Sequence, residues 1–247
     1  AVIVRSVTGA YDDFPHTGSL RYNDTLSKIP AVAISTVGAD KLSGYIKGSY
    51  KDENFFIRTN CEMLPDTIGH NVIGEIRGSE FPDEIITIGG HLDSWDPGEG
   101  ASDDGTGIVQ SIEILRAFKA IGYKPKRTIR IVLFANEENG LRGGNKYAEE
   151  AKLKNEKHVM AMESDGGAEY PRGFGCGMTK TQYEKVQPWV KYFEPFDATR
   201  FTFNEGGGGG ADIGPLQTAF KTPQFGLSTT GQRYFDVHHA ASDTFEK

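Results

Sequence analysis

Apolar positions between residues 84 and 147 follow a strand, helix, strand pattern. Two apolar runs, 85–88 and 129–134, have the length and composition of buried strands. Between them, apolar residues recur at the three-and-four spacing of a helix: Ile108, Ile112, Leu115 and Phe118. The economical interpretation is a βαβ unit, which predicts an α/β fold built on a parallel sheet.

Ionisable residues occupy three points of this unit. They follow the first run, precede the helix and follow the second run, in this order: His91 with Asp93, Asp103 with Asp104, and Glu137 with Glu138. All three points lie at the carboxyl ends of strands or at the start of the helix, where open α/β sheets bind their ligands. Two carboxylates about 4 Å apart repel by roughly 4 kcal/mol at an effective dielectric near 20. A bound cation would remove this cost, and imidazole with carboxylate ligands favours zinc, or less specifically manganese or cobalt.

Each pair alone has a simpler interpretation. His91 with Asp93 could be an ordinary loop, Glu137 with Glu138 a surface pair, and Asp103 with Asp104 a turn that caps a helix. Their order along one βαβ unit, at one edge of the predicted sheet, favours the metal site over three independent coincidences.

Four segments carry a resemblance to a known family: HLDSWDPGEGASDDGTG, FANEENGLRGG, MESDGG and HHAASDT. With them the chain resembles the two-zinc aminopeptidase family of zinc metallopeptidases, and within it the carboxypeptidase Q branch, also called plasma glutamate carboxypeptidase. The resemblance implies an α/β zinc-peptidase (phosphorylase/hydrolase-like) fold. This is a three-layer sandwich with a mixed, largely parallel sheet.

The resemblance also implies two Zn²⁺ ions per chain and a set of ligands. His91 and Asp165 would hold one ion, Glu138 and His239 the other, and Asp103 would bridge both. Only one member of the pair Glu163 and Asp165 is expected to join the cluster, and the family pattern selects Asp165. The spacing to the following Asp-Thr selects His239 over His238.

The mechanism that this ligand set implies is peptide hydrolysis by a hydroxide between the two zinc ions. Glu137 would act as the general base, and Asp93 would fix the tautomer of the His91 imidazole. A serine or cysteine nucleophile finds little support, because the chain lacks a G-x-S-x-G elbow and neither cysteine has a histidine nearby in sequence. Two alternatives remain: a one-zinc acyl transferase like glutaminyl cyclase, and a non-catalytic binding relative.

Substrate contacts are less firmly predicted. The glycine run 206–210 is interpreted as a flexible loop, with Asp212 capping the helix that follows it. By the resemblance, Glu205 or Asp212 would instead meet a peptide terminus, Tyr234 would steady an oxyanion, and His238 would lie near the substrate. The expected substrates are dipeptides or short peptides with a free amino end.

Two domains are expected: 1–64 as part of a β-rich protease-associated domain that acts as a lid, and 65–247 as the catalytic domain. By the resemblance, further segments of the catalytic domain would lie on both sides of this chain. A secretory signal upstream would imply a secreted or periplasmic protein, and homodimerisation is expected on the same ground.

Composition limits the other function classes. A net charge of −7 without a basic tract excludes nucleic acid as the expected partner. A hydrophobic fraction of 37% is that of a globular protein with a core, and no apolar run is long enough to predict a membrane span. Cys61 and Cys176 could form one disulfide or remain two buried thiols.

Overall fold

A computed structural model describes residues 1–48 and 54–246, and the chain divides into two compact units. Unit 1 comprises Ala1–Ile68, Trp95–Glu99 and Gln232–Lys247, and unit 2 comprises Gly69–Ser94 and Gly100–Gly231. The domain boundary after residue 64 stays a prediction. Unit 1 also takes in two segments that lie beyond this boundary in the sequence.

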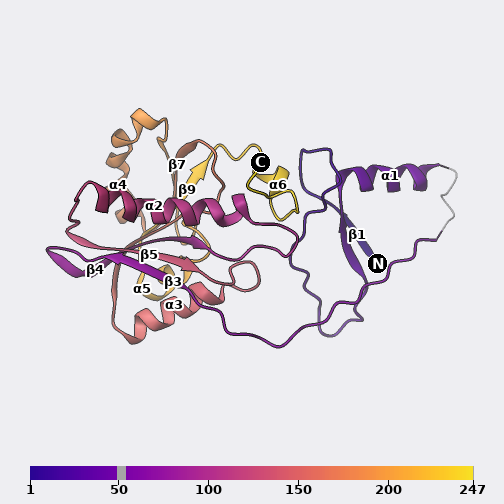
Figure 1. Cartoon of the computed structure of the whole chain (residues 1–247), viewed down its shortest axis with the longest axis horizontal. Helices are drawn as coiled ribbons and strands as arrows, with labels where there is room; N and C mark the ends of the chain where they lie inside the picture. The colour runs from indigo at the N-terminus through magenta and orange to yellow at the C-terminus, as the bar shows by residue number, and fades with distance from the viewer. Residues whose placement is uncertain (49–53, 247) are drawn as a thin grey trace. The chain divides into compact units, whose positions relative to one another are not determined.

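Unit 1 holds a small parallel sheet of β1 (Val2–Arg5) and β2 (Ala31–Ile34), together with helices α1 (Thr36–Lys47) and α6 (Tyr234–Val237) (Figure 1). The Ser35 hydroxyl accepts a hydrogen bond from the Gly38 amide and so caps the start of α1. The assignment of residues 1–64 to a protease-associated domain stays a prediction.

Unit 2 is built on a seven-stranded sheet in the order β3-β5-β4-β6-β9-β7-β8. The strands are β3 (Val72–Ile76), β4 (Phe81–His91), β5 (Arg127–Phe134), β6 (Lys157–Glu163), β7 (Pro171–Gly177), β8 (Arg200–Asn204) and β9 (Gln224–Thr229). The pairs β3 with β5 and β7 with β9 are antiparallel, and the other four pairs are parallel. The predicted mixed, largely parallel sheet is therefore confirmed.

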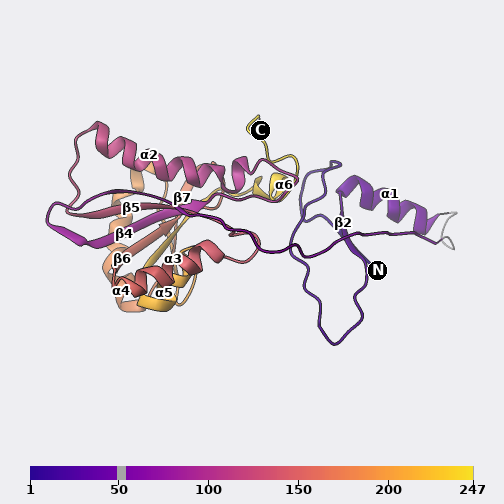
Figure 2. The ribbon, with the colours of Figure 1, turned by 60° about the horizontal axis from the view of Figure 1, so that its bottom comes forward.

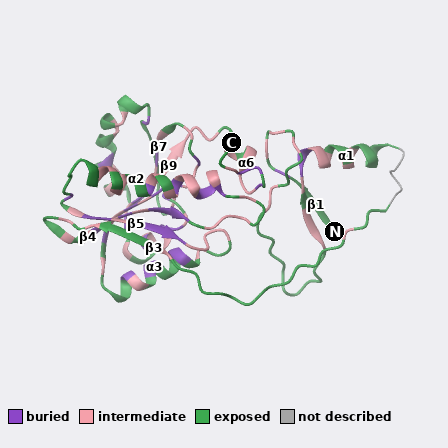
Figure 3. Ribbon diagram, viewed as in Figure 1, coloured by how far each residue is buried: buried purple, intermediate pink, exposed green. Residues whose placement is uncertain are grey.

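Helices cover both faces of this sheet (Figure 2). Helix α2 (Thr106–Ala120) lies on one face, and α3 (Arg142–Leu153) and α5 (Gly214–Phe220) lie on the other. Strand β5 is buried on both faces: Val132 and Phe134 pack in the core with residues of α3 and α5, whereas Ile131 and Leu133 lie on the α2 side. Burial on both faces explains why β5 is continuously apolar over residues 131–134 instead of alternating. Figure 3 shows buried residues concentrated in β4 and β5.

A second cluster of apolar side chains lies at the other end of the sheet, where Phe174, Cys176 and Phe225 pack with Val186. Val186 ends helix α4 (Lys180–Val186), and the chain continues as a 3-10 helix at Gln187–Tyr192. The change of helix type coincides with Pro188, whose ring cannot continue the α-helical hydrogen bonding.

Both cysteines are free thiols, Cys176 buried and Cys61 exposed. The disulfide alternative is therefore wrong for this structure, as is the expectation that both thiols are buried. Among the described residues, no helix has the length and apolar character needed to cross a membrane.

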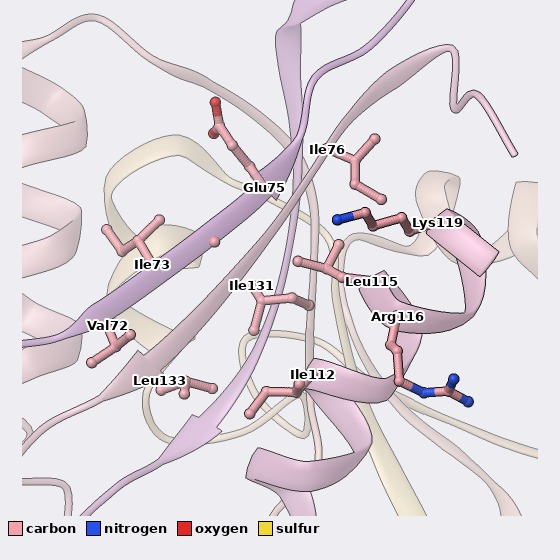
Figure 4. A pocket seen from close by; sticks show the side chains of 11 residues that line it. Val72, Ile73, Glu75, Ile76, Ile112, Leu115, Arg116, Lys119, Ile131 and Leu133 are labelled. Carbon is pink, nitrogen blue, oxygen red and sulfur yellow. The ribbon is translucent and has the colours of Figure 1, made fainter. Parts of the chain in front are cut away.

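An apolar groove of about 480 Å³ runs between the edge strand β3 and helix α2 (Figure 4). Aliphatic side chains form its walls, including Val72, Ile76, Ile112 and Leu115. None of the acidic residues predicted to bind metal lines it. The groove therefore lies apart from the chemistry that the sequence predicts.

Candidate metal centre

Parallel strands bring the predicted ligands to one edge of the unit 2 sheet. His91 is the last residue of β4, and Glu138 lies in the turn that follows β5. Asp165 lies two residues beyond the end of β6, and Asp103 lies just before α2 with a non-helical backbone conformation. Because β4 pairs in parallel with both β5 and β6, the carboxyl ends of these strands lie next to one another.

The His91 imidazole is the centre of this cluster. Its Nε2 lies 3.1 Å from Asp103 Oδ1 and 3.4 Å from Asp165 Oδ1. Donor atoms of His91, Asp103 and Glu138 also lie within 4.8 Å of one another. Four of the five predicted ligands thus come together in unit 2. Only Asp165, and not Glu163, has turned toward His91.

The electrostatics of the cluster call for a positive charge. Burial disfavours the imidazolium of His91, yet the carboxylates of Asp103 and Asp165 outweigh burial and raise the His91 pKa. Burial, together with the negative charge of Asp103, raises the Asp165 pKa. Burial also raises the pKa of Glu137 to about 7, and nearby carboxylates add to this effect. A divalent cation would relieve these interactions, so the donor set fits zinc.

Asp104 has a different role from its neighbour Asp103. Its Oδ2 accepts a hydrogen bond from the His91 amide at 2.9 Å, and its Oδ1 accepts one from the Gly107 amide at 3.0 Å. Asp104 is 1% exposed. Its two hydrogen bonds tie the end of β4 to the first turn of α2. Gly107 is needed there, because a Cβ atom would lie 1.9 Å from the Ser164 carbonyl oxygen and 2.4 Å from Asp104 Oδ1.

Asp93 contacts His91 and also the turn that follows β5. The His91 Nδ1 lies 2.8 Å from the backbone carbonyl oxygen of Asp93, whereas the Asp93 Oδ1 is 3.9 Å away. The carboxylate instead accepts hydrogen bonds from the amides of Glu137 at 3.0 Å and Glu138 at 3.2 Å. Asp93 thus offers an acceptor to the His91 Nδ1 through its backbone carbonyl, and its role in fixing the tautomer stays a prediction.

Glu163 anchors the segment that contains the glycine run. Its two carboxylate oxygens accept hydrogen bonds from the amides of Ala211 at 2.8 Å and Ile213 at 3.0 Å. Sequence reasoning missed this use of Glu163, and it also missed that Asp104 binds two amides. The only sign of these amide contacts in the sequence is that both acids lie close to glycines at the ends of strands or helices. Many acids lie at such positions without binding backbone amides.

Part of the glycine run 206–210 is closely packed, whereas a Cβ atom at Gly206 would meet nothing within 4 Å, and the interpretation of the run as a flexible loop stays a prediction. A Cβ atom at Gly175 of β7 would lie 2.2 Å from the Gly208 carbonyl oxygen, and one at Gly209 would lie 2.2 Å from the Gln224 Cβ. Glycine is required at these positions because backbone passes directly over backbone.

Asp212 does not cap the following helix. Helix α5 is preceded by Ile213 and has no side-chain cap. Asp212 is 1% exposed, and neither of its carboxylate oxygens has a hydrogen-bond partner among the described residues. Burial raises its pKa to about 8, with contributions from the charges of Glu137 and Asp165. Asp212 therefore belongs electrostatically to the acidic cluster.

Four further residues were predicted to belong to the site. Glu205 is exposed directly after β8. Tyr234, His238 and His239 belong to unit 1, where the two histidine rings stack with their centroids 3.6 Å apart. The Nδ1 of His239 lies 3.3 Å from the Thr17 carbonyl oxygen. The roles of these residues stay predictions.

A protein-family model and a curated relative each match most of this chain. The model of Peptidase family M28 matches residues 71–247. Carboxypeptidase Q of Mus musculus is 34% identical over 99% of this chain and 51% of its own length. The chain therefore spans about half the length of the curated relatives that it matches.

Two solved structures extend the comparison. A crystal structure of a peptidase M28 precursor from Shewanella amazonensis SB2B superposes with a TM-score of 0.83 at 36% identity, covering 99% of this chain and 54% of that one. A zinc aminopeptidase from Bacillus subtilis superposes with a TM-score of 0.54 at 22% identity, covering 71% of this chain and 44% of that one. The second likeness shows a shared fold only.

Proposed function

Because the chain belongs to peptidase family M28, we propose that it hydrolyses peptide bonds at a zinc centre formed at the carboxyl edge of the unit 2 sheet. The observation that carries this proposal is the convergence of Asp103 and Asp165 on the Nε2 of His91, at 3.1 and 3.4 Å. Two carboxylates that share one imidazole nitrogen are a costly arrangement for a protein that does not bind a cation there.

The proposed centre takes two zinc ions. His91, Asp103 and Asp165 would hold one of them. Glu138, whose donor atom lies within 4.8 Å of those of His91 and Asp103, would bind the other. His239 is assigned to the second ion by the sequence motif. The His239 Nδ1 lies beside the Thr17 carbonyl, and a histidine held in this way binds metal through Nε2.

Zinc bound at this centre would polarise the peptide carbonyl and lower the pKa of a water molecule to about 7. The chain itself supplies the proton transfer. Glu137 lies beside the ligand Glu138 in the turn after β5, and burial holds its pKa at about 7 in the absence of metal. Its carboxylate would accept the proton of the attacking water and then pass that proton to the leaving amine.

The proposed substrates are dipeptides or short peptides with a free amino end. The support is the 34% identity to a carboxypeptidase Q over nearly the whole chain. Contacts of Glu205, Asp212, Tyr234 and His238 with such a substrate are predictions from the sequence motifs. Homodimerisation and a secreted or periplasmic location have the same basis.

The proposal is tested by zinc content and hydrolysis measured on the same samples. Protein purified without added metal is expected to contain about two zinc ions and to cleave members of a dipeptide panel. Glu137→Gln should keep the zinc and lose about 10²- to 10⁴-fold in kcat, because it removes only the proton acceptor. The matched variant Glu138→Gln should lose zinc as well.

Other outcomes would contradict the proposal in distinct ways. Folded protein that binds no zinc even when zinc is supplied would exclude the metal centre and favour a binding module. Cyclisation of a glutaminyl peptide without hydrolysis of any dipeptide would favour an acyl transferase. Full activity in Glu137→Gln would exclude Glu137 as the base.

A further inference from the structure

We propose that His16 and Thr17 are positioning residues for His239, the histidine that the sequence motif assigns to the second zinc ion. Their backbone would hold the chain at His239 in its observed conformation and leave the Nε2 of the ring free to bind metal. The consequence for zinc rests on the proposed function, whereas the contacts lie within unit 1 and can be tested in protein without metal.

Both backbone groups of Thr17 face His239, although 222 residues separate the two in sequence. The Thr17 amide donates a hydrogen bond to the His239 carbonyl oxygen at 2.9 Å, and the Thr17 carbonyl oxygen lies 3.3 Å from the Nδ1 of the His239 ring. The neighbouring residues His16 and Ala240 form an antiparallel bridge. The segment at 16–17 therefore runs alongside the segment at 239–240 and contacts both its backbone and the ring of His239.

The contact with the ring decides which ring nitrogen carries the proton. A carbonyl oxygen can only accept a hydrogen bond, so the Nδ1 of a neutral His239 must be the donor, and its Nε2 keeps a free lone pair. The ring also stacks on His238 with the centroids 3.6 Å apart, and its centroid lies 5.5 Å from that of the Trp95 ring. Ring-to-ring contacts do not distinguish the two nitrogens, whereas a hydrogen bond to the Thr17 carbonyl does.

The backbone of His239 needs support from outside. Its φ angle is 57°, in the left-handed region where the side chain of an L-residue is crowded by its own backbone. A non-glycine residue keeps such a conformation only where its surroundings fix it. The hydrogen bond from the Thr17 amide fixes the carbonyl of His239, and the bridge with His16 fixes Ala240, the residue after it.

The segment at 16–17 is in turn anchored to the small sheet of unit 1. The His16 amide donates to the Ser6 hydroxyl at 2.9 Å, and that hydroxyl donates to the Ile34 carbonyl oxygen at 2.9 Å. Ser6 is 3% exposed and directly follows β1, and Ile34 is the last residue of β2. A series of backbone and hydroxyl contacts thus links the β1–β2 sheet to the proposed zinc ligand. Folding of this sheet and binding of the second zinc ion should therefore depend on each other.

The tautomer of His239 in metal-free protein tests the positioning role directly. It is read from the ring nitrogen resonances at a pH where the ring is neutral. Thr17→Pro removes the amide donor to His239, and its matched control Thr17→Ala keeps both backbone groups. Ser6→Ala removes the acceptor of the His16 amide, with the exposed Ser19→Ala as its control. The affinity for each zinc ion is measured on the same variants and the wild type.

Wild-type protein and both controls are expected to carry the proton of the His239 ring on Nδ1. Thr17→Pro should give a mixture of both tautomers, because the segment that faces the ring is no longer held against it. This variant should also bind one of its two zinc ions about 10- to 100-fold more weakly. Ser6→Ala should shift both readouts in the same direction by a smaller factor, because the contacts of Thr17 itself remain.

A proton on the Nε2 of His239 in wild-type protein would overturn the inference, even if the protein binds two zinc ions and cleaves dipeptides. An unchanged tautomer together with unchanged zinc affinity in folded Thr17→Pro would also overturn it. If Thr17→Pro does not fold, Ser6→Ala decides by the same two readouts. A proton on Nδ1 that is lost in Thr17→Pro would support the positioning role even in a protein that binds no zinc, and only the proposed function would then fail.

Discussion

The Nε2 of His91 and the Oδ1 of Asp165 lie 3.4 Å apart, although one residue ends β4 and the other follows β6. The Asp103 Oδ1 approaches the same nitrogen at 3.1 Å. Three donors from three separate segments thus meet at one point of the sheet edge. The side chains of His91 and Asp103 are buried there and that of Asp165 is partly buried, and the two carboxylates repel one another without a cation.

Removing either partner should therefore remove the metal. We expect His91→Ala and Asp165→Asn each to weaken zinc binding by about 100-fold or more, because a proposed ligand is lost. Zinc bound after dialysis against a chelator measures this loss. His70→Ala is the control, since His70 is an exposed histidine of the same unit. Equal retention of zinc in all three variants would contradict the assignment.

Asp212 predicts a pH-dependent stability of the metal-free chain. Its pKa is raised from an ordinary 3.8 to about 8, first by burial and then by neighbouring carboxylates. A raised carboxyl pKa means that the folded state loses stability as pH rises from about 4 to about 8. Asp212→Asn should reduce this loss, so its melting temperature should exceed that of the wild type by about 5 °C at pH 8.

The difference in melting temperature should shrink toward pH 4 and also on addition of zinc, because both treatments neutralise the cluster. Calorimetry over this pH range measures it, with Asp96→Asn as the exposed control. A melting temperature of Asp212→Asn that stayed below the wild type at pH 8 would show that Asp212 makes a stabilising contact.

His158 predicts the opposite pH dependence at a place away from the cluster. The ring is 6% exposed, with its Nδ1 2.8 Å from the Thr87 hydroxyl and its Nε2 3.2 Å from Glu156. Burial lowers its pKa, although Glu156 partly opposes this effect. A lowered histidine pKa contributes stability above pH 6.5 that is lost as pH falls through the folded-state pKa.

Wild-type protein should accordingly lose stability below pH 6.5, and His158→Gln should lose less over the same interval. Urea unfolding at pH 7.5 and pH 5.5 measures how far the free energy of unfolding of each protein falls between the two pH values. His70→Gln is the exposed control and should follow the wild type. Parallel curves for wild type and His158→Gln would show that another group causes the acid sensitivity.

The packing of the glycine run predicts a strict requirement for glycine in β7. Gly175→Ala places a Cβ atom 2.2 Å from the Gly208 carbonyl oxygen, so either strand or loop must move. We expect a loss of about 1 to 3 kcal/mol in the free energy of unfolding. Gly214→Ala is the matched control, because a Cβ atom there meets nothing within 4 Å. Similar unfolding curves for the two variants would contradict the packing.

The sequence by itself determined the βαβ unit and its chemistry. The two apolar runs and the helical spacing between them predicted β4, α2 and β5, because burial imposes those periods on any chain that folds this way. Parallel strands must end at a common edge, so residues placed after them had to lie near one another. His91, Asp103 and the pair Glu137 with Glu138 were therefore predictable as a group before any contact was known, and the family resemblance selected Glu138 and Asp165 as ligands.

Only the tertiary structure decided which atoms each acid contacts. Asp93, Asp104 and Glu163 each bind two backbone amides, whereas Asp103 and Asp165 turn toward His91. Neighbouring acids in sequence cannot be told apart by pattern, because their roles depend on which amides the loops of other strands leave unpaired. The same holds for the glycine run, because whether a glycine gives freedom or close packing depends on the backbone that lies across from it.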